Sequence, residues 1–198
     1  MGFGQQRVSV AFLVFSHLLI AAVAMSTVAI VVAAPAQALT INSKAREAIL
    51  MDAETGTVMY EHEADALMPP ASMSKLMTIL MVFDRLANGS LSMEDTFPVS
   101  EKAWRKGGSK MFVMVGTEIS IADLLRGVII QSGNDACIVI AEGIAGDEET
   151  FAAMMTERAR EIGLTHSTFR NATGWPDPDH MMTARDLATL ARLSLIHI

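Results

Sequence analysis

Hydrophobic and polar positions divide the chain into a long apolar leader, a short strand-like region and a series of helix-length segments. Residues 48–52 and 58–61 are short, mostly apolar runs joined by Ala53-Glu54-Thr55-Gly56, whose glycine suits a turn. This pattern predicts a β-hairpin at the start of the folded domain.

Residues 72–87 form the segment that is apolar on nearly every side of a helix. Pro69-Pro70 stops any regular structure before it, and Asn88-Gly89 follows as a C-cap. A helix without a polar face is expected at the centre of a core, so this segment predicts a buried central helix.

Further helices are expected from their start and stop signals. Ser120 with Asp123, and Thr183 with Asp186, have the spacing of capping boxes, and Gly163 follows a segment that begins with acidic residues. The expected helices cover 120–130, 135–145, 147–162 and a last segment from 183. A hairpin followed by a helical cluster predicts an α+β fold, with helices segregated from an antiparallel sheet.

Residues 1–38 have the pattern of an export signal. Arg7 precedes an apolar run from Val8 to Ala34, and Ala36-Gln37-Ala38 matches a small-x-small cleavage site. Cleavage would leave a chain that starts at Leu39. The apolar run is also long enough to span a bilayer, so an uncleaved anchor is the alternative. In both cases the remainder, 39–198, is expected outside the cytoplasm.

Charge and cysteine content exclude several classes of protein. The chain has 15 Lys and Arg against 22 Asp and Glu, a net charge of −7, which disfavours nucleic-acid binding. Cys137 is the only cysteine, so no intrachain disulfide is expected, and its apolar neighbours predict a buried side chain. The histidines lack metal-ligand spacing, and we expect no metal or cofactor.

Ser72 and Lys75 are the first candidate reactive pair. A hydroxyl and an amine three residues apart share one face at what we expect to be a helix start. A serine hydroxyl needs a base to become a nucleophile, and a lysine desolvated by neighbours such as Leu76 and Ile79 can be that base. The pair indicates acyl transfer. The alternative is an N-cap serine followed by a surface lysine.

Ser132-Gly133-Asn134 places a hydroxyl and a carboxamide between two apolar helices, either in a loop that faces a cleft or in a plain turn. With 70–78, which contains Ser-Met-Ser-Lys, it resembles the first two active-site motifs of the serine D-Ala-D-Ala carboxypeptidases, the low-molecular-mass penicillin-binding proteins. Segments that resemble this family in the same order are 108–112, 151–155 and 171–187. The resemblance covers roughly 48–191.

This resemblance implies a β-lactamase/penicillin-binding transpeptidase-like fold and specific roles. Ser72 would be acylated by the terminal D-Ala-D-Ala of a peptidoglycan stem peptide, with Lys75 as the proton acceptor. Ser132 would relay protons to the leaving amine, and Asn134 would hold the substrate amide and fix Lys75. Ser109 lies in a loop that borders the active site in relatives, or in an ordinary flexible turn.

The resemblance also implies partners and a location. β-Lactams would acylate Ser72 covalently, and the backbone amide of Ser72 would be one of two oxyanion donors. The protein would act in the periplasm, at the outer face of the bacterial cytoplasmic membrane, with or without a C-terminal membrane anchor. Asp177 and Asp179 fall in a segment similar to the family's Ω-like loop, which we expect them to brace.

The chain departs from the family pattern in two places. No lysine precedes Thr-Gly, so the third motif, Lys-Thr-Gly, is missing together with its cation and the second oxyanion donor. We therefore expect no appreciable turnover from the chain as given. Residues 193–198 diverge from the family and resemble a translated sequencing adaptor, so 39–198 is interpreted as a partial catalytic domain.

Two other functions are compatible with part of this pattern. A class A β-lactamase has the same first two motifs but uses a glutamate near the Ω-like loop, and 169–180 contains none. A non-catalytic envelope protein that only binds peptidoglycan would keep the cleft without turnover. The intact Ser72 and Lys75 argue against that second function.

Overall fold

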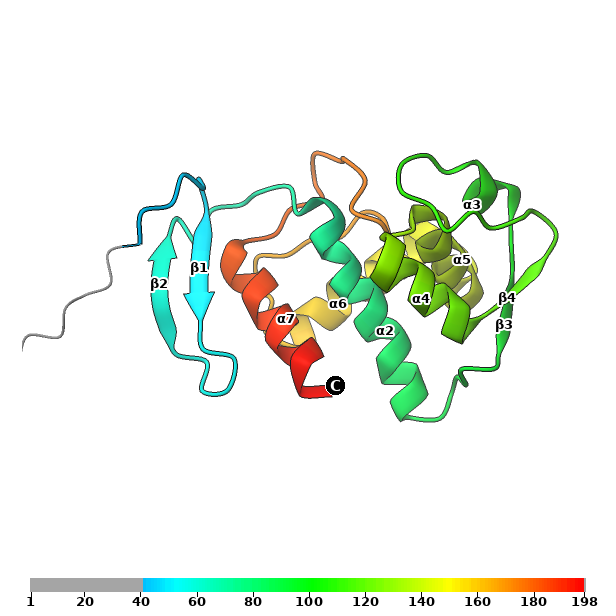
Figure 1. Cartoon of the computed structure of the whole chain (residues 1–198), viewed down its shortest axis with the longest axis horizontal. Helices are drawn as coiled ribbons and strands as arrows, with labels where there is room; N and C mark the ends of the chain where they lie inside the picture. The colour runs from blue at the N-terminus through cyan, green and yellow to red at the C-terminus, as the bar shows by residue number, and fades with distance from the viewer. Residues whose placement is uncertain (1–40, 198) are drawn as a thin grey trace, which may run out of the picture. The chain divides into compact units, whose positions relative to one another are not determined.

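Helices are the longest elements in the described part of the chain, residues 41–197 of a computed structural model (Figure 1). The elements are β1 Ala48–Met51, β2 Val58–His62, the 3-10 helix η1 Ala71–Ser74, α2 Lys75–Ala87, β3 Thr96–Pro98, α3 Glu101–Arg105, β4 Glu118–Ser120, α4 Ile121–Gln131, α5 Asn134–Ala145, α6 Glu148–Glu161 and α7 Ala184–His197. The predicted export signal, 1–38, lies outside the described residues. Within them, no helix combines the length and the hydrophobicity needed to cross a membrane.

The predicted hairpin is confirmed. β1 and β2 pair antiparallel, with Leu50 opposite Tyr60 and an irregularity between Leu50 and Met51. The turn forms because the Asp52 carboxylate accepts hydrogen bonds from the Thr55 backbone N–H (2.6 Å) and the Thr55 hydroxyl (2.7 Å). Gly56 follows with a φ of +77°, a conformation that favours glycine.

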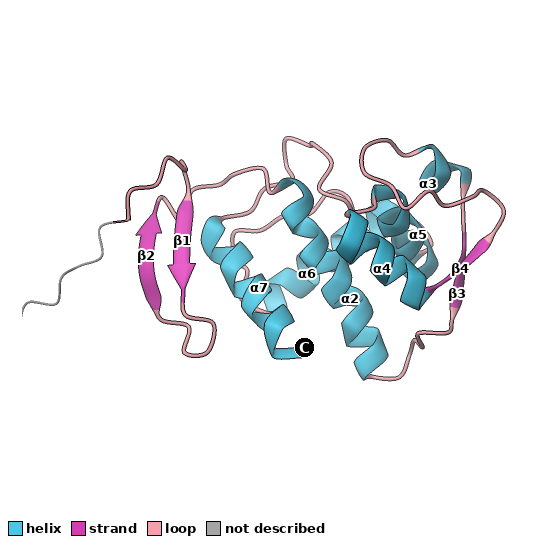
Figure 2. Ribbon diagram, in the orientation of Figure 1, coloured by secondary structure: helices cyan, strands magenta, loops and turns pink. Residues whose placement is uncertain are grey.

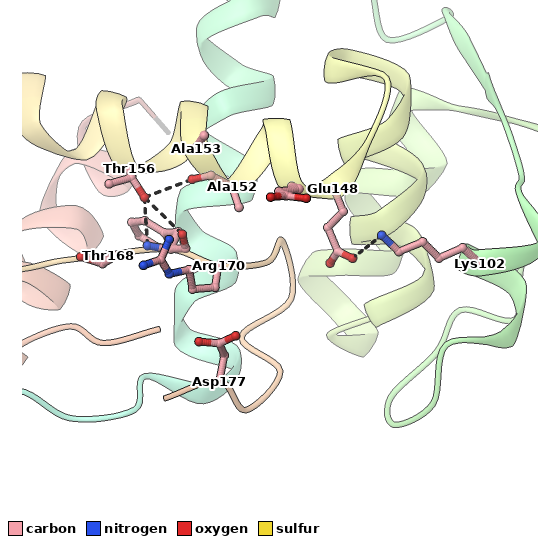
Figure 3. Close-up of a pocket in the computed structure, with 10 residues that line it drawn as sticks. Lys102, Glu148, Ala152, Ala153, Thr156, Thr168, Arg170 and Asp177 are labelled. Carbon is pink, nitrogen blue, oxygen red and sulfur yellow. Dashed lines mark hydrogen bonds and ion pairs between the residues drawn. The ribbon is translucent and has the colours of Figure 1, made fainter. Parts of the chain in front are cut away.

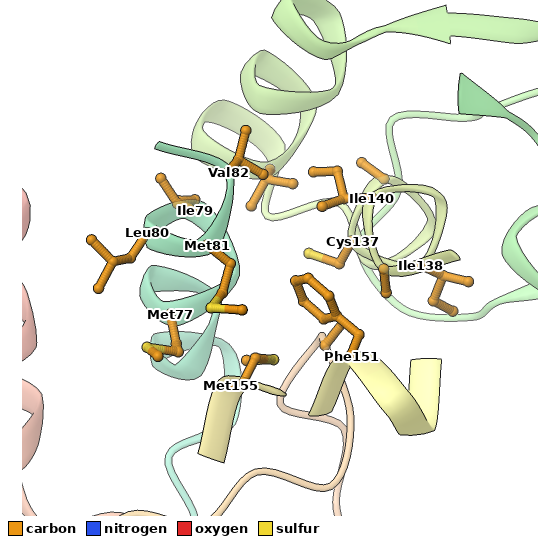
Figure 4. Packing of buried hydrophobic residues seen from close by; sticks show 14 of the residues in the cluster. Met77, Ile79, Leu80, Met81, Val82, Cys137, Ile138, Ile140, Phe151 and Met155 are labelled. Atoms are coloured by element: carbon orange, nitrogen blue, oxygen red, sulfur yellow. The ribbon is translucent and has the colours of Figure 1, made fainter. Parts of the chain in front are cut away.

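α2 is the central helix that the sequence predicts, and it contacts α4, α5, α6 and α7. Figure 4 shows the packing at its buried face, where Met81 faces Phe151 of α6 and Met77 lies beside Met155 of the same helix. Cys137 is fully buried, as expected. Burying apolar side chains in this way stabilises the helical cluster by about 25 cal/mol for each Å² removed from water.

The start of α2 differs from the expectation. Residues 71–74 form the 3-10 turn η1, and the α-helix begins only at Lys75, so Ser72 is not the N-cap of α2. The tighter turn follows from its neighbours, because Pro70 precedes it and Ala71 has a φ of +48°, outside the α region. The change affects the site, since side chains three residues apart eclipse in a 3-10 helix.

Local capping sets the other long helices close to the predicted bounds. The Ser120 hydroxyl accepts from the Asp123 backbone N–H (3.2 Å) at the start of α4, and the Asp147 carboxylate accepts from the Thr150 N–H (2.8 Å) at the start of α6. The Thr183 hydroxyl accepts from the Asp186 N–H (3.0 Å) before α7. These bonds satisfy N–H groups that a helix start leaves without partners.

The second small sheet and α3 are not predicted from the sequence. β3 and β4 pair antiparallel over three residues each, with Phe97 opposite Ile119 (Figure 2). Strands this short carry little periodic signal, and Pro98 disfavours a strand assignment. The α+β class is confirmed, with helices beside short antiparallel strand pairs.

Candidate active site

Ser72 and Lys75 meet at the junction of η1 and α2. The Lys75 Nζ lies 3.0 Å from the Ser72 Oγ, within hydrogen-bond distance. The 3-10 turn brings both side chains to one side, and Ala71 precedes Ser72 in a left-handed conformation that a residue with a Cβ adopts rarely. Backbone strain of this kind occurs often at active sites. The predicted nucleophile and base are therefore in reach of one another.

Lys75 is a buried amine, only 4% exposed. Burial lowers its pKa from the ordinary value because the charged form loses its hydration, and the nearby charge of Lys106 lowers it further. Burial raises the pKa of the Cys137 thiol to about 12, so Cys137 carries no charge near neutral pH. No ion pair of the described residues includes Lys75. Its surroundings favour the neutral amine, which is the form that can accept a proton.

The backbone carbonyl of Thr173 is the second partner of Lys75. Its oxygen accepts a hydrogen bond from Lys75 Nζ at 2.7 Å, and both groups are buried. One turn along α2, the fully buried Thr78 hydroxyl donates to the Ala172 carbonyl, also at 2.7 Å. Two successive carbonyls of the segment before α7 therefore fix two successive turns of α2. Sequence reasoning missed this contact, which joins residues 98 positions apart.

Ser132 lies with Ser72 and Lys75 around one cavity of about 310 Å³. It ends α4 in a left-handed conformation, with φ 54° and ψ 38°. The rest of the lining is mainly apolar: Leu76, Ile79, Phe83, Val128, Ile129 and Ser194. Three of the predicted site residues thus line one cavity. Its apolar lining lowers the local dielectric constant, which strengthens electrostatic interactions inside the cavity.

Asn134 and Ser109 are not among the residues that line the cavity with Ser72 and Lys75. The Asn134 backbone N–H donates to the Ser109 carbonyl (2.8 Å), and its carboxamide nitrogen donates to the Gly107 carbonyl (2.9 Å). Among the described residues no hydrogen bond joins Asn134 to Lys75, which Thr173 holds instead. Ser109 is exposed, and its side chain is not among those that line the cavity with Ser72. In this structure Asn134 fixes the loop that contains Ser109.

Asp135 is a residue of the site region that sequence reasoning took only as a helix start. Its carboxylate is fully buried and accepts hydrogen bonds from the backbone N–H groups of Met111 (2.9 Å), Phe112 (2.9 Å) and Val113 (3.2 Å). A buried charge requires such partners, and here they hold the loop after α3 against α5. The only signal in the sequence was an acid at the first turn of a helix.

A second cavity, of about 590 Å³, shares no lining residue with the first (Figure 3). At one side Lys102 Nζ lies 2.9 Å from the carboxylate of the buried Glu148, which also accepts from the Ala172 N–H at 3.2 Å. Asp177 lines this second cavity, and its carboxylate accepts from the Asp179 N–H (2.8 Å) within the same loop. The described residues contain no cluster of His, Cys, Asp or Glu suited to a metal ion.

Comparisons with known proteins show which family the chain resembles. The family model described as D-alanyl-D-alanine carboxypeptidase matches residues 31–197. The chain is 42% identical over 159 residues to the D-alanyl-D-alanine carboxypeptidase DacC of Escherichia coli, which covers 77% of this chain and 40% of DacC.

Solved structures show the same fold. The D-alanyl-D-alanine carboxypeptidase DacD of Francisella tularensis superposes with a TM-score of 0.77 at 37% identity, over 78% of this chain and 38% of that one. Penicillin binding protein 5 of Haemophilus influenzae superposes with a TM-score of 0.77 at 33% identity, over 80% of this chain and 47% of that one.

The chain spans about two fifths of the length of the curated relatives it matches. The family model nevertheless matches well over half of the chain, and the fold of the described residues is that of the solved relatives. The chain therefore belongs to the D-alanyl-D-alanine carboxypeptidase family, peptidase family S11.

Proposed function

We propose that the protein is a serine D-Ala-D-Ala carboxypeptidase that removes the terminal D-Ala from peptidoglycan stem peptides through an acyl-enzyme. The observation that carries the proposal is the 3.0 Å contact between Lys75 Nζ and Ser72 Oγ. The amine in this contact is buried, and burial lowers its pKa. The names of the relatives supply the reaction class. Ser72 is the nucleophile and Lys75 the base.

In the first step the Ser72 Oγ attacks the carbonyl carbon of the bond between the two D-Ala residues, and its proton passes to Lys75 Nζ. The carbon–nitrogen bond then breaks, and the leaving amine takes up a proton, relayed by the Ser132 hydroxyl from Lys75. Water hydrolyses the resulting ester and regenerates the Ser72 hydroxyl. The Ser72 backbone amide donates to the oxyanion that forms on the attacked carbonyl.

Asn134 contributes to substrate binding in this proposal. It begins α5 and fixes the 107–109 backbone, so the loop and the Asn134 carboxamide move together. Ser109 belongs to that loop and borders the bound peptide. β-Lactams acylate the same Ser72, because their strained amide replaces the scissile one.

The proposed place of action is the periplasm, at the outer face of the cytoplasmic membrane. The support is the export-signal pattern of residues 1–38 and the substrate, since peptidoglycan lies outside the cytoplasmic membrane. Residues from 39 onward then form the exported enzyme.

Covalent labelling with a fluorescent penicillin tests the nucleophile. The protein is prepared with a catalytic domain as long as that of its relatives. Labelled peptides are identified by mass spectrometry. We expect label on Ser72, none in Ser72→Ala, and full labelling of Ser90→Ala, which alters an exposed serine beyond the far end of α2. Label that survives Ser72→Ala would refute the assignment.

A second measurement tests the reaction class. The full-length protein should release D-Ala from a peptide that ends in D-Ala-D-Ala, and the penicillin ester on Ser72 should persist for many turnovers of that peptide. Rapid hydrolysis of the penicillin without D-Ala release would instead indicate a β-lactamase.

A further inference from the structure

The turn at 171–175 is organised by one side chain. The Asn171 carboxamide oxygen accepts from the Thr173 N–H (3.1 Å), the Thr173 hydroxyl (3.0 Å), the Gly174 N–H (2.8 Å) and the Trp175 N–H (3.0 Å). The carboxamide nitrogen of Asn171 donates back to the Trp175 carbonyl at 2.9 Å. A carbonyl oxygen has two lone pairs, so four donors around one oxygen make this side chain the centre of the turn.

The same turn is docked directly on the reactive pair. The Thr173 carbonyl accepts from Lys75 Nζ at 2.7 Å. Gly174 packs so closely that a Cβ placed on it would lie 1.8 Å from the Ala71 carbonyl oxygen. The conformation of the turn therefore decides where the Thr173 carbonyl points, and among the described residues this carbonyl and the Ser72 Oγ are the hydrogen-bond partners of Lys75 Nζ.

The direction of that carbonyl matters because of the shape of a neutral amine. Such an amine has two N–H bonds and one lone pair, and a base must aim its lone pair at the proton that it removes. When the Thr173 carbonyl takes one N–H of Lys75, rotation about the last carbon–nitrogen bond is restricted. The lone pair can then be held toward the Ser72 Oγ, 3.0 Å away.

The turn also positions the second amine near Lys75. The Nζ of Lys106 lies 4.5 Å from the centre of the Trp175 ring, a cation–π contact. Trp175 is held at both its N–H and its carbonyl by Asn171. The ionisable groups that act on the pKa of Lys75 are this Lys106 and Cys137 of α5, whose own pKa burial raises to about 12.

From these contacts we infer that Asn171 is a positioning residue for acylation: it shapes the 171–175 turn so that the Thr173 carbonyl orients Lys75 toward Ser72. The inference rests on the proposed function, in which Lys75 is the base. Asn171 itself touches neither partner of the proton transfer, and it acts through Thr173. A residue that only stabilised the turn would leave the pH dependence of acylation unchanged, whereas loss of a residue that positions Lys75 should change it.

The experiment measures the rate of Ser72 acylation by a fluorescent penicillin as a function of pH and of penicillin concentration, in the full-length protein. The variants are Asn171→Ala, which removes the centre of the turn, and Asn171→Asp, which keeps the accepting oxygen. Asn88→Ala is the matched control. Asn88 accepts from the Ser90 N–H (3.0 Å) in a similar local turn, at the other end of α2.

For Asn171→Ala we expect acylation at neutral pH to slow by about 10- to 100-fold, the cost of a misplaced reacting group. The midpoint of the pH profile should move to higher pH, because water reaches Lys75 and its pKa returns toward the ordinary value. The penicillin concentration for half-maximal rate should change little. Asn171→Asp should label within about 3-fold of the parent with a raised midpoint, since a carboxylate favours protonated Lys75. Asn88→Ala should match the parent in both.

Each other outcome overturns the inference. A folded Asn171→Ala variant with the parent's rate and midpoint would show that the turn does not orient Lys75, and so would an equal slowing in Asn88→Ala. If Asn171→Ala fails to melt cooperatively, the Asn171→Asp variant decides, and a parent-like midpoint there refutes the role. A parent that takes no label on Ser72 removes the proposed function itself, whereas a labelled parent with unaffected variants removes this inference alone.

Discussion

Gly174 allows the sharpest test of how the segment before α7 supports the reactive pair. It has a φ of +78°, and a Cβ built on it would lie 1.8 Å from the Ala71 carbonyl oxygen and 2.6 Å from the Ser74 Oγ. Gly174→Ala therefore adds one methyl group at a contact made by backbone on both sides. Neither side can relieve the contact by rotating a side chain, so the turn and η1 must separate.

The size of the effect follows from two contributions. A left-handed conformation costs an alanine about 1–2 kcal/mol. Relief of the contact with Ala71 requires a separation of roughly 1 Å, and overpacking of this kind costs about 1–3 kcal/mol. The free energy of unfolding should fall by about 2–5 kcal/mol in total. The same displacement would stretch the 2.7 Å bond between Thr173 and Lys75 beyond hydrogen-bond range and slow Ser72 acylation about 10- to 100-fold.

Gly163→Ala is the matched control, because Gly163 has a φ of +85° with no atom within 4 Å of an added Cβ. It should lose only the conformational cost, about 1–2 kcal/mol, and label at the parent rate. Both variants are compared by denaturant unfolding and by labelling with a fluorescent penicillin. If Gly174→Ala unfolds and labels like Gly163→Ala, the reasoning that the 171–175 turn presses on the reactive pair is refuted.

Three further predictions concern the buried ionisable groups. The rate of Ser72 acylation should rise with pH through a midpoint below 10.5, the ordinary pKa of lysine, because only neutral Lys75 accepts the proton. Lys75→Arg should abolish labelling at every pH where the fold survives. Labelling that persists in this variant would exclude Lys75 as the base. Asp135→Asn should lower the free energy of unfolding by about 1–3 kcal/mol, since a carboxamide cannot accept all the N–H groups around it, and an unchanged denaturant midpoint would contradict this. Cys137, whose pKa burial raises to about 12, should resist a thiol reagent at pH 8 in the native protein and react on unfolding, whereas fast native reaction would show that it is accessible.

The long helices could be predicted from the sequence because their ends are set locally. Each capping side chain lies three residues before the N–H group from which it accepts a hydrogen bond, as in Ser120, Asp147 and Thr183. The residues that start each helix are therefore close together in the sequence and can be recognised there. The hairpin was predicted for a similar reason, from Gly56 between two apolar runs. In each case no contact from elsewhere in the chain is needed to explain the assignment.

Elements that depend on distant partners could not be predicted in this way. β3 and β4 are three residues long, and each pairs with the other across the 19 residues that separate them in the chain. A distant segment also contacts η1, since Gly174 packs against the Ala71 carbonyl, and no local pattern indicates this contact. The sequence predicts a helix that begins at Ser72, because apolar periodicity does not distinguish a 3-10 start from an α-helical one.

The candidate site shows the same division. Ser72, Lys75 and Ser132 are recognisable because their side chains carry the chemistry, and the structure brings them to one cavity. Thr173 contributes a backbone carbonyl, which any residue could supply, so its identity gives no signal. Asn171 resembles any asparagine in a turn until the target of that turn is known.

The lowered pKa of Lys75 is a property of the tertiary structure, not of the motif that contains it. Burial is the largest cause of its lowered pKa, and the groups that bury it come from α5 and from the 171–175 turn as well as from α2. A Ser-x-x-Lys sequence on an exposed helix would keep a charged lysine and an inert serine. The burial of Lys75 in the cavity, and not the Ser-x-x-Lys spacing alone, therefore makes the pair reactive. A substitution that exposes Lys75 to water should change the pH dependence of acylation before it abolishes the fold.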